Sequence, residues 1–408
     1  MTNGFDILKE RGFIAQTSNE DAVRKLFGTG QVTFYTGFDP TADSLTAGHF
    51  IPIMAMAHLQ RAGHRPIVLV GGGTGVIGDP TDRSELRKMM TPEEIQYNSD
   101  CFKRQLSRFL DFTDDRAIMV NNADWLLKLE YVPFIRDYGI HFSVNKMLTA
   151  DVYRTRFERG LTFFEFNYML MQSYDFLELF RRYNCKVQMG GNDQWSNILA
   201  GADLIRRVEN AEAHCMTYIL LTTSDGKKMG KSQKGAVWLD RERTTPYEFF
   251  QYWRNTGDAD VIKFLKLLTF LPLSEIDSMA EWQGGELNKA KEILAFELTK
   301  TVHSEEDAVQ ARNAARELFG GAASGGSVPE AEISASDWGG GMSIIDVLSK
   351  TGLAATRSDG RRLISQGAVR VNDKRIDNFD QIVELKDGSA LIQKGKKVFL
   401  RLKVTDFT

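Results

Sequence analysis

The sequence predicts an α/β protein with three folded parts. The first is a doubly wound, Rossmann-like parallel-sheet domain with a helical insertion, the second is an α-helical domain, and the third is a small α+β domain. Three observations predict this order: strand-like and helical segments alternate in the first half, residues 246–318 have a helical pattern, and a Gly-, Ala- and Ser-rich segment at 320–341 precedes a basic end. A chain of 408 residues can bury several cores.

The first domain contains short apolar, β-branched runs that are typical of buried strands. Helical segments separate them, such as the run from about Ala47 to Arg61, so crossover helices should join parallel strands. The stretch TPEEIQYNSDCFKRQLSRFL (91–110) opens with Thr-Pro, a helix-start signal. From about Ala123 to Tyr183 the pattern is mostly helical, which predicts the insertion. The predicted strands are VTFYTG (32–37), PIVLVG (66–71), AIMVN (117–121) and CKVQMG (185–190).

The second half begins with a lysine-rich loop and continues in helices. KFLKLLTFL and AKEILAFELTKTVH have amphipathic spacing, which predicts a separate helical domain. The segment GGAASGGSVPEAEISASDWGGG cannot support a core and predicts a flexible linker. The predicted parts are therefore 1–223 for the first domain, 224–235 for the loop, 236–319 for the helical domain, 320–341 for the linker and 342–408 for the small domain.

Composition excludes several classes of protein. The apolar stretches are far shorter than a bilayer requires, and the start MTNGFDILKERGF lacks the features of a secretion signal, so we expect a cytoplasmic protein. Cys101, Cys185 and Cys215 are odd in number and form no C-x-x-C pair. Buried reduced thiols are therefore expected, with neither a disulfide framework nor a zinc site.

The charge is unevenly distributed along the chain. The formal net charge is −3, but residues 343–408 contain 13 Lys plus Arg against 8 Asp plus Glu, a net +5, which leaves −8 for the rest. A basic domain on an acidic body suggests a polyanionic partner, although a solvated basic surface would give the same count.

Two segments combine residues that suit phosphate groups. In YTGFDPTADSLTAGHF (35–50), Gly48 and His49 fall in the first turn of a predicted helix, where free N–H groups attract anions. By itself a Gly-His pair is more often a packing glycine with a capping histidine. In SDGKKMGKSQKG (224–235), closely spaced lysines on a Gly-flexed loop could close over a triphosphate, whereas a solvated charged turn is the simpler explanation.

Taken together, these segments resemble a known family. DPTADSLTAGH (39–49) and KMGKS (228–232) are similar to the HIGH and KMSKS signatures of class I aminoacyl-tRNA synthetases, at the spacing of the tyrosine enzymes. YTGFDPTADSL, YMLMQSYDF (168–176) and GGNDQW (190–195) also resemble bacterial tyrosyl-tRNA synthetases, and the likeness covers essentially the whole chain.

The resemblance implies a tyrosine pocket. It assigns Tyr35 and Asp175 to the substrate hydroxyl, and it places Gln194 near the carboxylate. The α-amino group would be held by Tyr168, Gln172 and Asp79. The helical spacing of Tyr168, Gln172 and Asp175 agrees with this, since it puts all three on one face. Each of them alone would more often be a core residue.

The resemblance also implies ATP as a substrate. Attack of the tyrosine carboxylate on the α-phosphorus needs no general base, so positioning and positive charge should supply most of the acceleration. Mg²⁺ is expected to accompany ATP, without a metal site formed by the protein itself. The implied ATP-binding residues are Asp39, Gly48, His49, Arg83, Arg87, Asp193 and Lys231, and the implied catalytic residues are Thr41, Thr46, His49, Lys228, Lys231 and Ser232.

One position departs from the family. Thr46 stands where the first histidine of HIGH is usual, and threonine is shorter and cannot become cationic. We therefore expect Thr41, His49 and the loop lysines to carry the activation step.

The basic end has a signature of its own. MSIIDVLSKTGLAATRSDGRRLISQGAVRVNDKRI resembles the small RNA-binding module shared by a ribosomal protein and bacterial tyrosyl-tRNA synthetases. The resemblance implies tRNA(Tyr) as partner, a tRNA-binding role for the helical domain as well, and a homodimer. The residues expected to contact RNA phosphates are Arg361, Arg362, Arg370, Lys374 and Arg375.

Three other interpretations remain open at this point. The run G-T-G-V-I-G (73–78) fits a dinucleotide-binding fingerprint, but a polar turn follows where a helix should continue. A non-catalytic RNA-binding relative is the second, because of Thr46. The third is a tryptophan enzyme of the same fold, against which Tyr35 and Asp175 favour a phenol over an indole.

Overall fold

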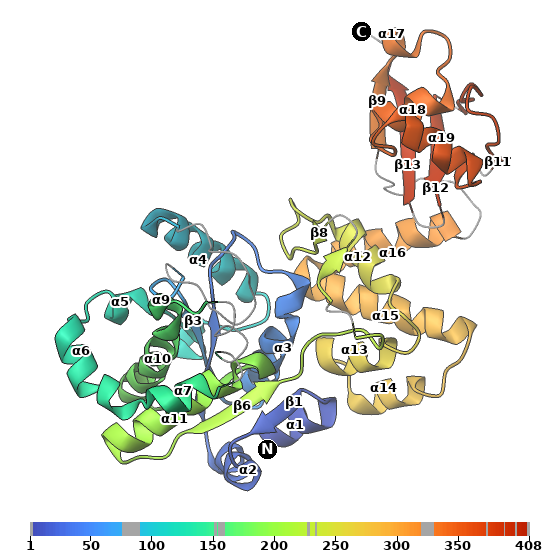
Figure 1. The fold of residues 1–408 in the computed structure, drawn as a ribbon. Helices are drawn as coiled ribbons and strands as arrows, with labels where there is room; N and C mark the ends of the chain where they lie inside the picture. The colour runs from blue at the N-terminus through green and yellow to red at the C-terminus, as the bar shows by residue number, and fades with distance from the viewer. Residues whose placement is uncertain are drawn as a thin grey trace. The chain divides into compact units, whose positions relative to one another are not determined.

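The chain forms two compact units in the computed structural model (Figure 1), Met1–Val309 and Gln310–Thr408. The structure describes residues 3–75, 90–150, 153, 160–226, 229–232, 235–319, 330–372, 374–386, 388–395 and 398–405, with backbone only for 164, 231–232 and 317–319. In these ranges no helix is long and apolar enough to cross a bilayer.

The first unit is built on a six-stranded sheet with the order β1-β6-β5-β2-β3-β4. Neighbouring strands are parallel except at one edge, where β1 runs antiparallel to β6. The predicted parallel sheet and its four strands are confirmed, whereas β1 and β6 were not predicted. The strands are β1 (Ile14–Thr17), β2 (Thr33–Phe38), β3 (Arg65–Val70), β4 (Ile118–Asn121), β5 (Cys185–Gly191) and β6 (His214–Tyr218).

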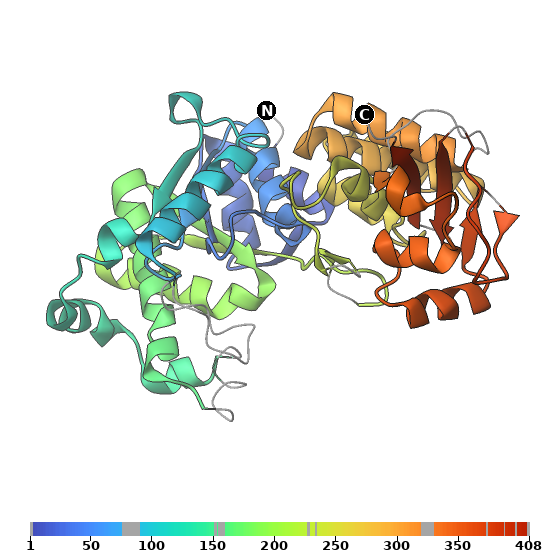
Figure 2. The same cartoon turned by 90° about the horizontal axis from the view of Figure 1, so that it is seen from above.

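The strand order reverses between β2 and β5. From β2 the chain moves to β3 and β4 on one side, and it later returns to β5 and β6 on the other. Right-handed crossovers therefore place α3 (Phe50–Arg61) and α11 (Trp195–Glu209) on opposite faces of the sheet (Figure 2). Such a switch point leaves a crevice at the carboxyl ends of the strands, where ligands bind in this class of fold.

Helix α4 (Pro92–Leu106) begins where the sequence signal predicts. Thr91 and Glu94 form a reciprocal capping box with Pro92 in the first turn, which confirms the Thr-Pro signal. The described part of the insertion between β4 and β5 is helical, as predicted. The remaining helices in the described residues before β6 are α1 (Gly4–Arg11), α2 (Glu20–Thr29), η1 (Ala47–His49), η3 (Thr113–Asp115), α5 (Ala123–Leu126), α6 (Tyr131–Asp137), η4 (Gly139–His141), α7 (Val144–Leu148), α9 (Phe163–Phe166), α10 (Tyr168–Tyr183) and η5 (Asn192–Gln194).

A helical region follows β6, as predicted, and a short hairpin that was not predicted lies in the lysine-rich segment before it. The fully buried Trp253 lies in the core of the helical region, and α12 packs on α15. Arg11 connects α1 to this region, because its guanidinium donates to the carbonyls of Lys266, Thr269 and Leu271 at and just after the end of α13. The elements are β7 (Lys231–Ser232), β8 (Gly235–Ala236), α12 (Pro246–Arg254), α13 (Val261–Leu268), α14 (Leu273–Met279), α15 (Gly285–Val302) and α16 (Glu305–Phe319).

The second unit contains a five-stranded sheet with the order β11-β10-β12-β13-β9. Its first strand, β9 (Glu330–Ser334), pairs in parallel with β13 (Val398–Thr405) and is followed by α17 (Ala335–Trp338). Part of the segment predicted as a linker is therefore folded here, because Ile333 reaches the core of this unit. The other elements are α18 (Ile344–Lys350), α19 (Arg357–Ser365), β10 (Val369–Val371), β11 (Lys374–Arg375) and β12 (Ser389–Lys394).

Candidate active site

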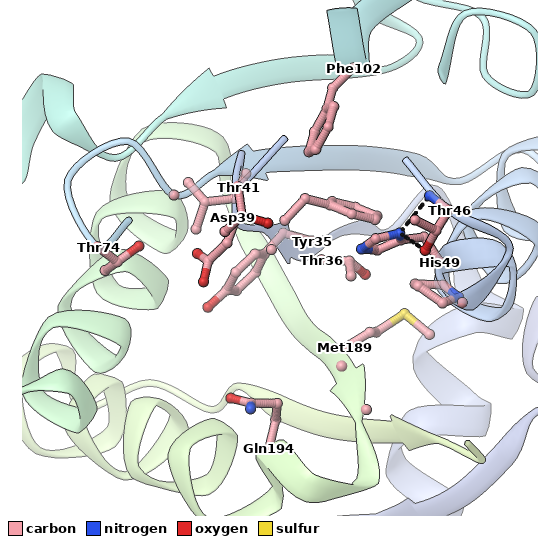
Figure 3. Close-up of a pocket in the computed structure, with 18 of the residues that line it drawn as sticks. Tyr35, Thr36, Asp39, Thr41, Thr46, His49, Thr74, Phe102, Met189 and Gln194 are labelled. Atoms are coloured by element: carbon pink, nitrogen blue, oxygen red, sulfur yellow. Dashed lines mark hydrogen bonds between the residues drawn. The ribbon is translucent and has the colours of Figure 1, made fainter. Parts of the chain in front are cut away.

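A pocket of about 530 Å³ lies at the switch point of the first unit. In Figure 3, the hydroxyl of Tyr35 and the carboxylate of Asp39 lie toward Thr74 at one end, and Thr46 and His49 lie at the other. Both predicted groups of residues thus meet in one cavity. The predicted site residues that line it are Tyr35, Asp39, Thr41, Thr46, Gly48, His49, Tyr168, Gln172, Asp175 and Gln194.

Tyr35 presents a buried hydroxyl to this pocket from β2. Its side chain is 1% exposed, and the hydroxyl has no hydrogen-bond partner among the described residues. The ring is held against Phe176, with 5.4 Å between the centroids. Burial, and secondarily the charge of Asp175, raises the pKa of Tyr35 well above its ordinary value, so the group stays a neutral phenol. A buried hydroxyl without a partner is costly unless a ligand supplies one.

Asp175 of α10 is the buried carboxylate beside it. Its Oδ1 accepts a hydrogen bond from Nε1 of Trp125 at 2.7 Å, and its Oδ2 accepts one from Nδ2 of Asn122 at 2.9 Å. Burial raises the pKa of Asp175 to about 7, although the two hydrogen bonds act in the opposite direction. Each oxygen keeps a lone pair that a ligand hydroxyl could use.

Asn122 and Trp125 are functional residues that the sequence analysis missed. Asn122 follows β4 at the carboxyl edge of the sheet. Besides its hydrogen bond to Asp175, it contacts the segment that follows β3. Its Oδ1 accepts from the backbone N–H of Gly73 at 2.7 Å, and its Nδ2 lies 3.0 Å from Oγ1 of Thr74. A usable signal was present, because polar residues directly after a predicted parallel strand often reach a ligand site.

Two amide oxygens of the pocket are also buried without hydrogen-bond partners among the described residues. They are Oε1 of Gln172 on α10 and Oε1 of Gln188 on β5. Tyr168, Gln172 and Asp175 line one wall, as their spacing on the helix predicts. Gln188 was not predicted, although a lone glutamine inside the apolar run CKVQMG was a visible signal. Such groups are suited to the polar atoms of a bound ligand.

His49 is fixed as a hydrogen-bond donor at the other end of the pocket. Its Nδ1 lies 3.0 Å from the backbone N–H of Thr46, which donates to it, and 3.1 Å from Oγ1 of Thr46. Burial lowers the pKa of His49, so the ring is neutral at pH 7. Because Nδ1 accepts a hydrogen bond, Nε2 carries the proton and can donate it to a phosphate oxygen.

The backbone brings the two signature segments together. The N–H of Ala47 donates to the carbonyl of Val237 at 2.8 Å, and the N–H of Leu239 donates to that of Leu45 at 2.9 Å. Residues 237–239 thus return from the lysine loop and pair with the segment before η1. Gly230 lines the same pocket as Gly48.

Several predicted site residues cannot be placed in the pocket. Four of them lie outside the described residues: Asp79, Arg83, Arg87 and Lys228. For Lys231 and Ser232, only the backbone is described. Asp193 in η5 is exposed; its Oδ2 accepts from Nε2 of Gln194 at 3.2 Å, and it does not line the cavity. The assignments of these residues remain predictions.

The predicted RNA-binding residues lie on the surface of the second unit. Arg361 and Arg362 are exposed on α19, and Arg370, Lys374 and Arg375 are exposed on β10 and β11. Two of them are in surface ion pairs, Arg362 with Asp359 at 3.0 Å and Arg375 with Asp377 at 2.9 Å. Surface pairs are weak and could exchange for phosphate contacts.

Metal binding by protein side chains alone has no support in the described part of the chain. No group of three or more His, Cys, Asp or Glu side chains there could hold a metal ion.

The raised pKa of Asp175 makes a prediction about stability and pH. The carboxyl group of Asp175 holds its proton more tightly in the folded protein than in the unfolded chain. The protonated carboxyl group therefore contributes fully to the free energy of unfolding below about pH 4, and this contribution is lost as the pH rises through about 7. In the absence of ligands, we expect wild type to lose on the order of 2–4 kcal/mol relative to Asp175→Asn between pH 4 and 8. Thermal melting across this range measures it, with the exposed Asp124→Asn as control. A pH-independent difference between wild type and Asp175→Asn would refute the assignment.

The comparisons with known proteins agree with this geometry. The family described as "tRNA synthetases class I (W and Y)" matches residues 28–320, and the S4 domain matches residues 342–388. The chain is 56% identical to the tyrosine–tRNA ligase of Acetivibrio thermocellus over 99% of this chain and 100% of that protein, and 55% identical to that of Clostridium botulinum (strain Loch Maree / Type A3) over 99% and 100%.

Solved structures show the same fold. A C-terminally truncated Aspergillus nidulans mitochondrial tyrosyl-tRNA synthetase is 30% identical with a TM-score of 0.70, covering 78% of this chain and 95% of that one. The Archaeoglobus fulgidus tyrosyl-tRNA synthetase, complexed with L-tyrosine, is similar in fold alone, at 19% identity, a TM-score of 0.57 and coverage of 76% and 99%. With these matches and a pocket that joins both signature segments, the chain belongs to the tyrosyl-tRNA synthetases of class I.

Proposed function

We propose that this pocket activates L-tyrosine with ATP, releasing pyrophosphate, and then passes the tyrosyl group to the 3′-terminal adenosine of tRNA(Tyr). The observation that carries the proposal is the partnerless hydroxyl of Tyr35, buried in the same cavity as the carboxylate of Asp175. A phenol can satisfy both groups at once, since it donates one hydrogen bond and accepts another.

The same pair explains how tyrosine would be preferred over phenylalanine. Bound phenylalanine would leave the hydroxyl of Tyr35 buried and unpaired. This free-energy penalty weakens the binding of phenylalanine and not that of tyrosine. Selection of this kind is already known for tyrosyl-tRNA synthetases, and Tyr35 and Asp175 are the residues proposed to carry it in this chain. Tryptophan would also fail, because an indole N–H donates but does not accept.

The remaining polar groups suit the other parts of tyrosine and ATP. The α-amino group of the substrate tyrosine would be held by Tyr168, Gln172 and Asp79, and its carboxylate would lie near Gln194. The carboxylate then attacks the α-phosphorus while negative charge grows on the departing pyrophosphate. His49 would donate from Nε2 to a phosphate oxygen, and Lys228, Lys231 and Ser232 would stabilise the charge on the leaving group. Mg²⁺, bound to the phosphates of ATP, would neutralise part of that charge.

The first test is tyrosine-dependent pyrophosphate exchange compared with phenylalanine and tryptophan. We expect a strong preference for tyrosine, and we expect Tyr35→Phe to narrow the ratio of kcat/KM for tyrosine over phenylalanine by roughly 5- to 100-fold, through the loss of tyrosine activity. Tyr218→Phe is the matched control, because Tyr218 is fully buried, its hydroxyl lies 3.3 Å from that of Thr36, and it does not line the pocket. An unchanged ratio in Tyr35→Phe would contradict the proposed readout.

Thr46 is proposed to act through His49, since both its N–H and its hydroxyl lie next to Nδ1. The backbone hydrogen bond survives in Thr46→Ala, so we expect stopped-flow measurements to show only about a two- to fivefold loss in the rate of adenylate formation. Lys231→Ala should lose far more, because it removes charge needed in the transition state. A loss in Thr46→Ala as large as that in Lys231→Ala would refute this division of roles.

The second unit is proposed to bind tRNA through its exposed arginines and lysines. It has a hydrophobic core of its own, and the first strand of its sheet is β9. A truncation after Phe319 removes β9 together with the rest of the sheet, whereas one after Gly341 would leave β9 without its partner strand. We expect the truncated protein to keep pyrophosphate exchange within about twofold while tRNA charging falls at least tenfold and loses its steep salt dependence. Parallel loss of both activities would count against the proposal.

A homodimer is also proposed, and exposed apolar side chains on the insertion support it. The insertion carries several large apolar side chains that are more than half exposed, and an interface between two copies of the chain would remove them from water. The mass of the protein in solution, measured by light scattering, decides this. The group comprises Leu127, Tyr131, Val132, Ile140, Val144 and Phe163.

A cytoplasmic location is proposed because tRNA charging serves translation. The three cysteines, Cys101, Cys185 and Cys215, are all buried and unpaired, which fits a reducing compartment.

A further inference from the structure

The backbone of Gly230, in the middle of the KMGKS segment, is held on several sides. Its φ of +98° is one that residues with a side chain rarely adopt, and a Cβ atom here would lie 2.8 Å from the backbone nitrogen of Gly48. Its carbonyl accepts from the N–H of Val237 at 2.9 Å. Its own N–H donates to the hydroxyl of Tyr252 at 3.0 Å. The last contact is the only one of these made by a side chain.

Tyr252 comes from α12, which is well anchored. The helix starts with a capping box formed by Thr245 and Glu248, and Trp253, next to Tyr252, is fully buried. The rings of Tyr252 and Trp253 meet edge to face, with 5.1 Å between the centroids. The position of the Tyr252 hydroxyl is therefore set by the core of the helical region.

The hydroxyl of Tyr252 serves the loop in two ways. It accepts from Gly230, and it lies 3.6 Å from the sulfur of Met229, to which it can donate. Burial raises the pKa of Tyr252, so the hydroxyl stays protonated at neutral pH. Met229 and Gly230 line the active-site pocket, whereas Tyr252 does not. Tyr252 thus contacts the backbone between two proposed phosphate-binding lysines without reaching the substrates.

We propose that Tyr252 is a positioning residue that holds the lysine loop against the first signature segment during tyrosine activation. This inference rests on the proposed function. Fixing the peptide of Gly230 fixes the point from which the side chain of the next residue, Lys231, starts, and a small displacement of a charged group lowers its effect on a transition state steeply. Without the hydroxyl, the N–H of Gly230 loses its partner and the loop is held by fewer contacts.

The test compares Tyr252→Phe with Tyr247→Phe. Both variants remove one phenolic oxygen from α12, but the hydroxyl that contacts Gly230 and Met229 is that of Tyr252. In single-turnover measurements at saturating tyrosine and ATP, we expect Tyr252→Phe to slow adenylate formation about three- to tenfold, as for the loss of one hydrogen bond. The Kd for tyrosine, measured by equilibrium dialysis, should stay the same, and Tyr247→Phe should match wild type in both.

A second measurement follows the contact itself and does not depend on activity. Hydrogen–deuterium exchange should be faster for a peptide spanning Gly230 in Tyr252→Phe, and unchanged in Tyr247→Phe. An unchanged rate of adenylate formation in Tyr252→Phe, or a slower rate without faster exchange, would overturn the proposal. If wild type formed no adenylate from tyrosine, the proposed function would fail, while the exchange data would still test whether Tyr252 holds the loop.

Discussion

A carboxylate that is almost entirely removed from water must be hydrogen bonded, and in this protein that carboxylate is Asp175. Its side chain is 2% exposed, and both oxygens accept hydrogen bonds from Trp125 and Asn122. These donors come from the end of β4 and from α5, while Asp175 comes from α10 and Tyr35 from β2. The tyrosine end of the pocket therefore exists only when the sheet, the insertion and α10 are assembled together, which links the choice of substrate to the fold.

The nucleotide end is organised by backbone pairing. The segment before η1 and residues 237–239 exchange hydrogen bonds, so the chain after the lysine loop is fixed to the element that holds His49. Thr46 contributes through its backbone N–H, which any residue at this position except proline could supply. This explains in physical terms how the position can be a threonine where the family usually has a histidine.

Much of the fold and of the pocket could be predicted from the sequence. The four strands with long β-branched runs were found, and the i, i+4, i+7 spacing placed Tyr168, Gln172 and Asp175 on one wall. The edge strand β1, with the sequence IAQT, is short and partly exposed, so it lacks the apolar run that identifies a central strand. The strand β9 was missed because its alternating sequence lies next to a Gly- and Ser-rich segment.

The missed site residues have a common cause. Asn122, Trp125 and Gln188 act through contacts between segments that are distant in the chain, and a sequence pattern reports only local spacing. The contact between Tyr252 and Gly230 was missed for the same reason: Tyr252 lies in a helix that otherwise reads as an ordinary amphipathic element.

The central claim is that one pocket reads a phenol at one end and holds a nucleotide phosphate at the other. A crystal structure with a non-hydrolysable analogue of tyrosyl-adenylate tests it most directly. The account predicts that the phenolic oxygen of the ligand lies within hydrogen-bond distance of both the Tyr35 hydroxyl and the Asp175 carboxylate, with Nε2 of His49 facing the phosphate or its substitute. A ligand bound with its phenol away from Tyr35 and Asp175 would contradict the account.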